Sequence, residues 1–290
     1  MHEGLAELNR RFPDLADVVG QVGQLRDRNA RSKREAFFEP RSLVVVADGK
    51  PTLPAVGAAS FNAWRRHMGD GSSVRMRALE VGMTAELLAS RMISAMAVAR
   101  AHMEVAGLAA YCCRALYEAG RSGEFEPLEK LVLQTYFGSN MRIQVKGTPE
   151  LDAYLRLEEV RPLRTGDLIK AMDAFQAPND RPGTRCQLTY GLLSEYAHPA
   201  MRATSATFAD VVSEHDDGWF IQYHEADRLD EASVKMALEI LLDNMRVGHA
   251  CAALLDRAVV YETGGVCQLQ PPSSEEGHDI YVNLLQQPVD

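Results

Sequence analysis

Apolar residues recur at helical spacing in two long stretches of the chain. The first stretch, residues 84–118, alternates at spacings of four and three and uses mainly small or sulfur-containing side chains: Met92, Met96, Ala99, Met103, Ala106, Ala110, Cys113 and Tyr117. The second follows Asp230, a suitable N-cap, and ends near Tyr261 with the same spacing: Val234, Leu238, Leu241, Met245, Gly248, Ala252, Leu255 and Val259. Such a period is typical of helices that bury one stripe against another helix. We therefore expect two long helices packed along their length, the first of them capped by Gly120.

The remaining patterns predict a mainly α fold, an antiparallel helical bundle with one or two small β-hairpins. Residues 1–73 are interpreted as an N-terminal helical segment with a possible hairpin after SLVVVA (42–47), closed by a loop at 69–73 (GDGSS). Residues 74–263 form the bundle, with a hairpin near 206–224 around Asp216-Asp217-Gly218. Residues 264–290 lack helical period and are interpreted as an extended or disordered tail.

A third helix is expected from Thr184 to His198, after the break at Pro182-Gly183. Thr184 and Gln187 have the spacing of a capping box. Two rows run along this helix at intervals of four residues: an apolar stripe of Leu188, Leu192 and Tyr196, and a polar row of Tyr190, Ser194 and His198. The polar row fits two interpretations, a functional face or a buried row that bonds to neighbouring helices and holds them in register.

Candidate chemistry centres on His198. The sequence has no glycine-rich phosphate loop, no G-x-S-x-G motif and no H-E-x-x-H pair. An imidazole can act as a general acid or base near neutral pH, with Glu104 or Glu195 to orient it and Arg100 to stabilise negative charge. Further candidate binding residues lie on this third helix and beside the first seam: Tyr190, Ser194, Glu195, Tyr111 and Arg114. The eight histidines show no metal-ligand spacing along any one helix, so we expect neither a metal nor a cofactor.

Charge and composition limit the partners. The net charge of −9 disfavours RNA, although it stays an alternative partner because one basic run occurs: Arg26, Arg28, Arg31, Lys33 and Arg34. That run is more simply explained as a solvated helix face. No apolar stretch approaches the roughly 20 residues of a membrane span. The N-terminus lacks the pattern of a signal peptide, and the five cysteines form no C-x-x-C pair, so a cytoplasmic protein is expected.

The segments ARAHMEVAGLAAYC and YGLLSEYAHP resemble a group of bacterial helical domains similar to the HEPN superfamily, over roughly residues 84–260. The resemblance implies an antiparallel helical bundle, frequent homodimers, and relatives that include ribonucleases of toxin–antitoxin and phage-defence systems. Catalytic HEPN domains carry an arginine, then four to six intervening residues, then a histidine on one helix. No histidine here has an arginine at that offset, because Arg100–His102 and Arg246–His249 are too close.

Three functions remain open at this stage. The leading one is a noncatalytic helical interaction module of HEPN-like ancestry, in a bacterial defence or stress system, that forms a homodimer or binds another protein. The second is a ribonuclease or other hydrolase that uses His198 with Arg100 and Glu104. The third is a small-ligand sensor with its pocket between the two long helices.

Overall fold

The computed structural model describes residues 3–29, 45–47, 50–52, 58–137, 162–176, 184–198, 209–215, 218–223 and 230–270. Within these ranges the chain is mainly helical, and the predicted helical bundle is confirmed. In this part of the chain, no helix combines the length and apolar character that a membrane span requires.

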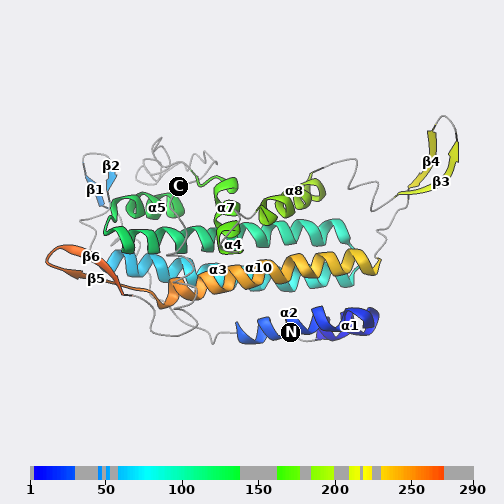
Figure 1. Ribbon diagram of the computed structural model, residues 1–290, viewed down its shortest axis with the longest axis horizontal. Coiled ribbons are helices and arrows are strands. Elements are labelled where there is room, and N and C mark those ends of the chain that lie inside the picture. Colours follow the sequence, from blue (N-terminus) through cyan, green and yellow to red (C-terminus); the bar gives the residue numbers. More distant parts are fainter. Residues whose placement is uncertain are drawn as a thin grey trace, which may run out of the picture.

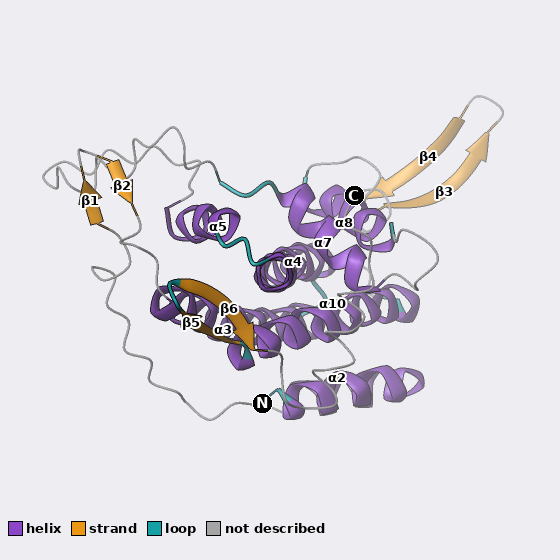
Figure 2. Ribbon diagram, turned by 60° about the vertical axis from the view of Figure 1, so that its left-hand side comes forward, coloured by secondary structure: helices purple, strands orange, loops and turns teal. Residues whose placement is uncertain are grey.

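Three long helices form the centre of the bundle: α3 (Ala58–Leu88), α4 (Met92–Ser122) and α10 (Glu231–Arg257). On one side lie α1 (Glu3–Arg11), a 3-10 turn at Pro13–Leu15, and α2 (Ala16–Arg28), which packs on α10. On the other side of α4 lie α5 (Glu126–Phe137), α7 (Thr165–Gln176) and α8 (Arg185–Ala197) (Figures 1 and 2). The central helix α4 is therefore covered on two sides.

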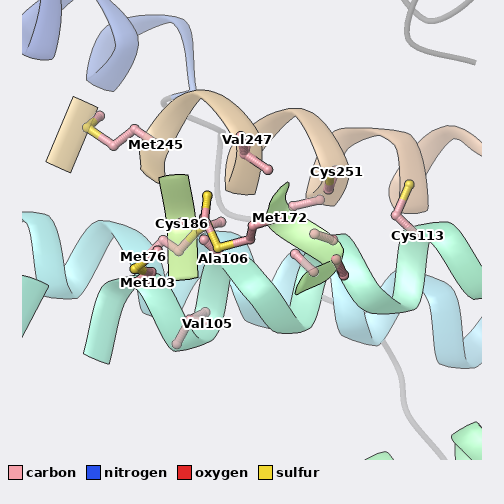
Figure 3. Close-up of a cluster of buried hydrophobic side chains, with 14 of the residues drawn as sticks. Met76, Met103, Val105, Ala106, Cys113, Met172, Cys186, Met245, Val247 and Cys251 are labelled. Carbon is pink, nitrogen blue, oxygen red and sulfur yellow. The ribbon is translucent and has the colours of Figure 1, made fainter. Parts of the chain in front are cut away.

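The predicted seams are confirmed as the core. All eight seam residues of α4 are buried, as are the first seven of the second seam, and α4 packs against α10. Methionine, cysteine and alanine side chains fill the space between these helices and α3 (Figure 3). Gly248 lies at the closest approach, since a Cβ there would be 2.5 Å from the sulfur of Met76 and 2.7 Å from Cβ of Ala106. Further along, Cys251 faces Cys113, so α4 and α10 run in the same direction while the short turn at 89–91 makes α3 antiparallel to α4.

The predicted loop at residues 69–73 is wrong, because these residues lie in the middle of α3. Gly69 allows α10 to approach closely: a Cβ would be 2.8 Å from the carbonyl oxygen of Ala252. Ser72 and Ser73 are buried. The small residues that resembled a loop therefore serve helix packing, and α3 continues across residue 73, where the sequence analysis placed a boundary.

Helix ends follow the expected cap in one case and depart from it in another. Asp230 caps α10 as predicted, because its side chain accepts a hydrogen bond from the backbone N–H of Ser233 at 2.6 Å. The helix α4 continues past Gly120 to Ser122, and Gly123 with φ of 76° forms its left-handed C-cap. Gly120 instead lies against the side chain of Leu269. The prediction of Gly120 as the cap is therefore wrong.

The described strands form three two-stranded antiparallel hairpins. Two match the sequence analysis: β1 (Val45–Ala47) with β2 (Lys50–Thr52), and β3 (Ala209–His215) with β4 (Gly218–Tyr223). The third, β5 (Val259–Thr263) with β6 (Val266–Gln270), was not predicted. Here α10 ends at Arg257, and Gly264 and Gly265, with φ of 61° and 80°, make a tight turn. The other residues of the expected tail, 271–290, lie outside the described residues.

Candidate functional site

Helix α8 is anchored by a carboxylate from a neighbouring helix. The Asp173 side chain of α7 is buried and accepts hydrogen bonds from the backbone N–H groups of Cys186 (2.7 Å) and Gln187 (3.2 Å). It thereby satisfies N–H groups that a helix N-terminus leaves without partners. Thr184 makes no side-chain cap, so the predicted capping box is wrong: the cap comes from α7.

The orientation of α8 directs Tyr190 of its polar row toward α4 and Leu188 of its apolar stripe toward solvent. Cys186 and Leu193 are the buried residues of the helix, and the Tyr190 side chain reaches α4. Leu188, by contrast, is 72% exposed. The apolar stripe identified in the sequence is therefore divided, because Tyr196 packs partly against the core while Leu188 faces outward.

Tyr190 links α8 to two residues of α4. Its hydroxyl accepts hydrogen bonds from Nη2 (2.8 Å) and Nε (3.1 Å) of Arg100 and donates one to Oε1 of Glu104 (2.8 Å). Arg100 Nε also lies 3.3 Å from Glu104 Oε1, and its guanidinium carbon is 5.1 Å from the centre of the tyrosine ring. Burial and the bond to Glu104 raise the pKa of Tyr190 above its usual 10.0. The phenol therefore stays protonated and acts as a hydrogen-bonding link.

His198 joins the edge of this network. It is the exposed C-cap residue that follows α8, and its Nε2 lies 3.4 Å from Nη1 of Arg100, which can donate to it. The structure thus brings together His198, Arg100, Glu104 and Tyr190, four of the residues selected from the sequence. Glu104 bonds to Tyr190 and Arg100, and within the described residues no hydrogen bond joins Glu104 or Glu195 to the His198 ring.

The other selected residues lie outside this network. Ser194 donates to the carbonyl oxygen of Tyr190 within its own helix (2.7 Å). Arg114 pairs with Glu118 on α4 (2.6 Å), and Tyr111 is partly buried there, where burial and the charge of Asp167 raise its pKa. Glu195 is partly exposed on α8. The candidate site is therefore the network of four residues between α4 and α8.

A second polar cluster, missed in the sequence, lies inside the bundle. Glu80 of α3 is 1% exposed, and its Oε1 accepts from Nε2 of His249 on α10 (2.7 Å) and lies 3.4 Å from Nε2 of His102 on α4. Arg26, expected on a solvated face, is buried here, and it donates from Nη2 to the Glu80 carbonyl oxygen and to the Thr84 hydroxyl, both at 2.6 Å. The four charged or titratable residues come from four different helices, and their sequence neighbours give no signal of the cluster.

The charges in this cluster compensate one another. Burial by itself would raise the pKa of Glu80, but hydrogen bonds from His102 and His249 lower it to about 2. Burial lowers the pKa of His102, which favours its neutral form. Glu80 is thus an ionised carboxylate whose counter-charge is Arg26, with Nε 3.7 Å from Oε2. In the described part of the chain no group of three His, Cys, Asp or Glu side chains is arranged to hold a metal.

Comparisons of the chain with models of protein families, with curated proteins and with solved structures found no match.

Proposed function

We propose that this protein is a noncatalytic helical interaction module of HEPN-like ancestry that pairs with a second copy of itself through the outward face of α8. The observation that supports this proposal is the 72% exposure of Leu188 on a helix that uses its polar row to join the bundle. The HEPN-like resemblance is the support for assigning the module to a bacterial defence or stress system.

The interior contacts of α8 leave its outward face available. Arg100 and Glu104 already bond to the hydroxyl of Tyr190, so these groups fasten α8 to α4. Asp173 holds the other end of the helix. An exposed apolar residue on a helix fixed at both ends costs little conformational entropy to bury, which favours association.

The outward face is complementary to itself. In an antiparallel pairing of two α8 helices centred on the position of Tyr190, Leu188 of one copy faces Leu192 of the other, and Arg185 faces Glu195. A Cβ added at the exposed Gly191 would meet no atom within 4 Å, so this glycine offers open space for the backbone of a second helix. Self-complementary patches of this kind produce two-fold dimers, which are the commonest closed assemblies.

Light scattering at micromolar concentration tests the pairing. We expect twice the chain mass of 32.0 kDa for the unchanged protein and a single chain mass for Leu188→Glu. Each copy contributes one Leu188, and burial of a leucine stabilises by about 1.5–3 kcal/mol, so the dissociation constant should rise at least about 100-fold. The matched control is Val74→Glu on α3, which changes a residue that is 59% exposed.

Two outcomes would contradict this pairing. One is a monomer for the unchanged protein at micromolar concentration. The other is a dimer that Leu188→Glu leaves intact or that Val74→Glu disrupts equally. Glu195→Arg gives an independent check, because it places a cation opposite Arg185 of the other copy and should weaken the dimer.

The contact between Arg100 and His198 favours a second candidate, an RNA-cleaving hydrolase. No single helix carries an arginine and a histidine at the catalytic spacing. Arg100 of α4 and His198 at the end of α8 nevertheless lie 3.4 Å apart, and His198 is exposed. Incubation of the purified protein with single-stranded RNA separates the candidates. Cleavage that His198→Ala abolishes without a change in Tm would favour the hydrolase; no cleavage, with the dimer intact in His198→Ala, is the result that the interaction module requires.

A further inference from the structure

An open cavity of about 530 Å³ lies between α2, the start of α8, and α10. A smaller inner cavity of about 90 Å³ adjoins it between α4, α8 and α10. Arg185, Glu239 and Asp243 line both, so they stand where the two meet. The inner cavity exceeds the roughly 10–15 Å³ that one water molecule requires, and the outer one falls in the range of small-ligand sites, about 300–1,000 Å³.

A buried amide without a partner lines the inner cavity. Asn244 is 2% exposed, and its Nδ2 makes no hydrogen bond within the described part of the molecule. Buried polar groups are almost always hydrogen-bonded, because loss of their water contacts is otherwise uncompensated. The donor therefore indicates that an acceptor enters the cavity.

Charges of both signs stand around the entrance. Asp243 is shared by two arginines, since its carboxylate pairs with Arg185 and lies 3.6 Å from Nη1 of Arg246. Glu239 is exposed and has no ion pair among the described residues. Arg185 is 72% exposed and uses one of its N–H groups on Asp243, which leaves further donors. A cationic donor and an unpaired carboxylate thus stand beside each other.

One wall of the smaller cavity is apolar. Met103 of α4, labelled in Figure 3, and Met236 and Ile240 of α10 line it together with Cys186. Burial raises the pKa of the Cys186 thiol to about 12, so that it remains an uncharged wall group. Methionine side chains adapt to irregular apolar groups. The lining therefore suits a short aliphatic chain.

We propose that this pair of cavities binds a small zwitterion of the α-amino-acid type with an aliphatic side chain. The carboxylate of the ligand accepts from Asn244 and Arg185, its ammonium group pairs with Glu239, and its aliphatic part lies among Met103, Met236 and Ile240. This site shares Arg185 with the proposed pairing surface, but Glu239, Asn244 and the apolar lining belong to α4 and α10, so ligand binding does not depend on the pairing.

Thermal unfolding with each of the twenty L-amino acids at 10 mM tests the proposal. We expect at least one aliphatic amino acid to raise Tm by about 5 °C, the shift for a ligand at 100 times its Kd. Calorimetry then compares that amino acid with its amine and its carboxylic acid counterparts, each of which keeps only one charge. Both should bind at least about tenfold more weakly, because each loses one charged hydrogen bond.

Two variants test whether the ligand binds at this pair of cavities. Glu239→Gln removes an exposed charge at the entrance and should raise Kd about tenfold while Tm without ligand stays unchanged. Asn244→Leu should abolish binding, and if it fails to fold, Glu239→Gln alone decides. Glu231→Gln, an exposed change at the start of α10, is the matched control. The proposal is overturned if no amino acid raises Tm, if the amine or the acid binds as tightly as the amino acid, or if Glu239→Gln binds as tightly as Glu231→Gln.

Discussion

Replacement of Glu80 by glutamine would test whether the buried cluster stabilises the bundle through charge. Glutamine keeps the shape and one carbonyl oxygen of the side chain, but it removes the charge that compensates Arg26. The pKa of Glu80 falls from 4.5 to about 2 in the folded protein. Since each pH unit of this difference corresponds to about 1.4 kcal/mol, the ionised carboxylate contributes about 3 kcal/mol. Loss of one partner of a buried pair typically costs a similar amount.

The expected result is a free energy of unfolding lower by about 3 kcal/mol at pH 7, measured by urea denaturation. The pH dependence follows from the sign of the shift. A carboxyl whose pKa is lowered by folding stabilises fully above its ordinary value of 4.5, and this stabilisation is lost as the pH falls through the range from 4.5 to about 2. The difference between the unchanged protein and Glu80→Gln should therefore shrink by about 1.4 kcal/mol for each pH unit below 4.5.

A surface carboxylate supplies the control. Glu118 pairs with Arg114 at 2.6 Å, but its side chain is 43% exposed, so Glu118→Gln should cost less than about 1 kcal/mol. The reasoning fails if Glu80→Gln costs no more than Glu118→Gln at pH 7. It also fails if the cost of Glu80→Gln stays constant between pH 7 and pH 3.

Three further changes probe the packing of the long helices and the anchoring of α8. Leu241→Asp buries an unpaired carboxylate in the seam of α10 and should lower the free energy of unfolding by several kcal/mol, about 3–5; an unchanged urea midpoint would contradict the packing of the two seams. Gly248→Ala places a Cβ 2.7 Å from that of Ala106 and should lower the free energy of unfolding by about 1–3 kcal/mol. The control Gly20→Ala, whose Cβ would meet no atom within 4 Å, should raise it by about 0.4–1 kcal/mol. Equal effects of the two changes would refute the close approach at Gly248. Asp173→Ala removes two hydrogen bonds from the start of α8 and should cost about 1–2 kcal/mol, with faster amide exchange in α8; unchanged exchange there would show that the cap does not hold the helix.

The long helices could be predicted because their signal is local. In α4 and α10 each turn repeats the same choice of apolar residue, and that period reports burial of one face whatever the partner is. The cap at Asp230 was predictable for the same reason, since its acceptor and the Ser233 N–H lie three residues apart.

Other features depended on partners from distant parts of the chain. Gly69, Ser72 and Ser73 carry a loop-like composition, yet a helix passes through them because α10 packs against Gly69 and needs a small residue there. The cap of α8 likewise comes from Asp173, which accepts a hydrogen bond from the Cys186 N–H. The residues next to Thr184 give no indication of this partner on another helix.

The candidate site shows the same division. The sequence by itself determined that Tyr190 and His198 share a row of α8 and that Arg100 and Glu104 are four residues apart on α4, because helical spacing sets both. Only the tertiary structure decided that these two pairs meet: Arg100 contacts Tyr190, 90 residues away, and His198, 98 residues away. It also decided that Leu188 faces outward. It also decided that Glu80 and His249, 169 residues apart, share a buried hydrogen bond. A periodic pattern indicates that a helix buries one face. Which face packs against the bundle depends on the distant groups that can form hydrogen bonds with its polar atoms.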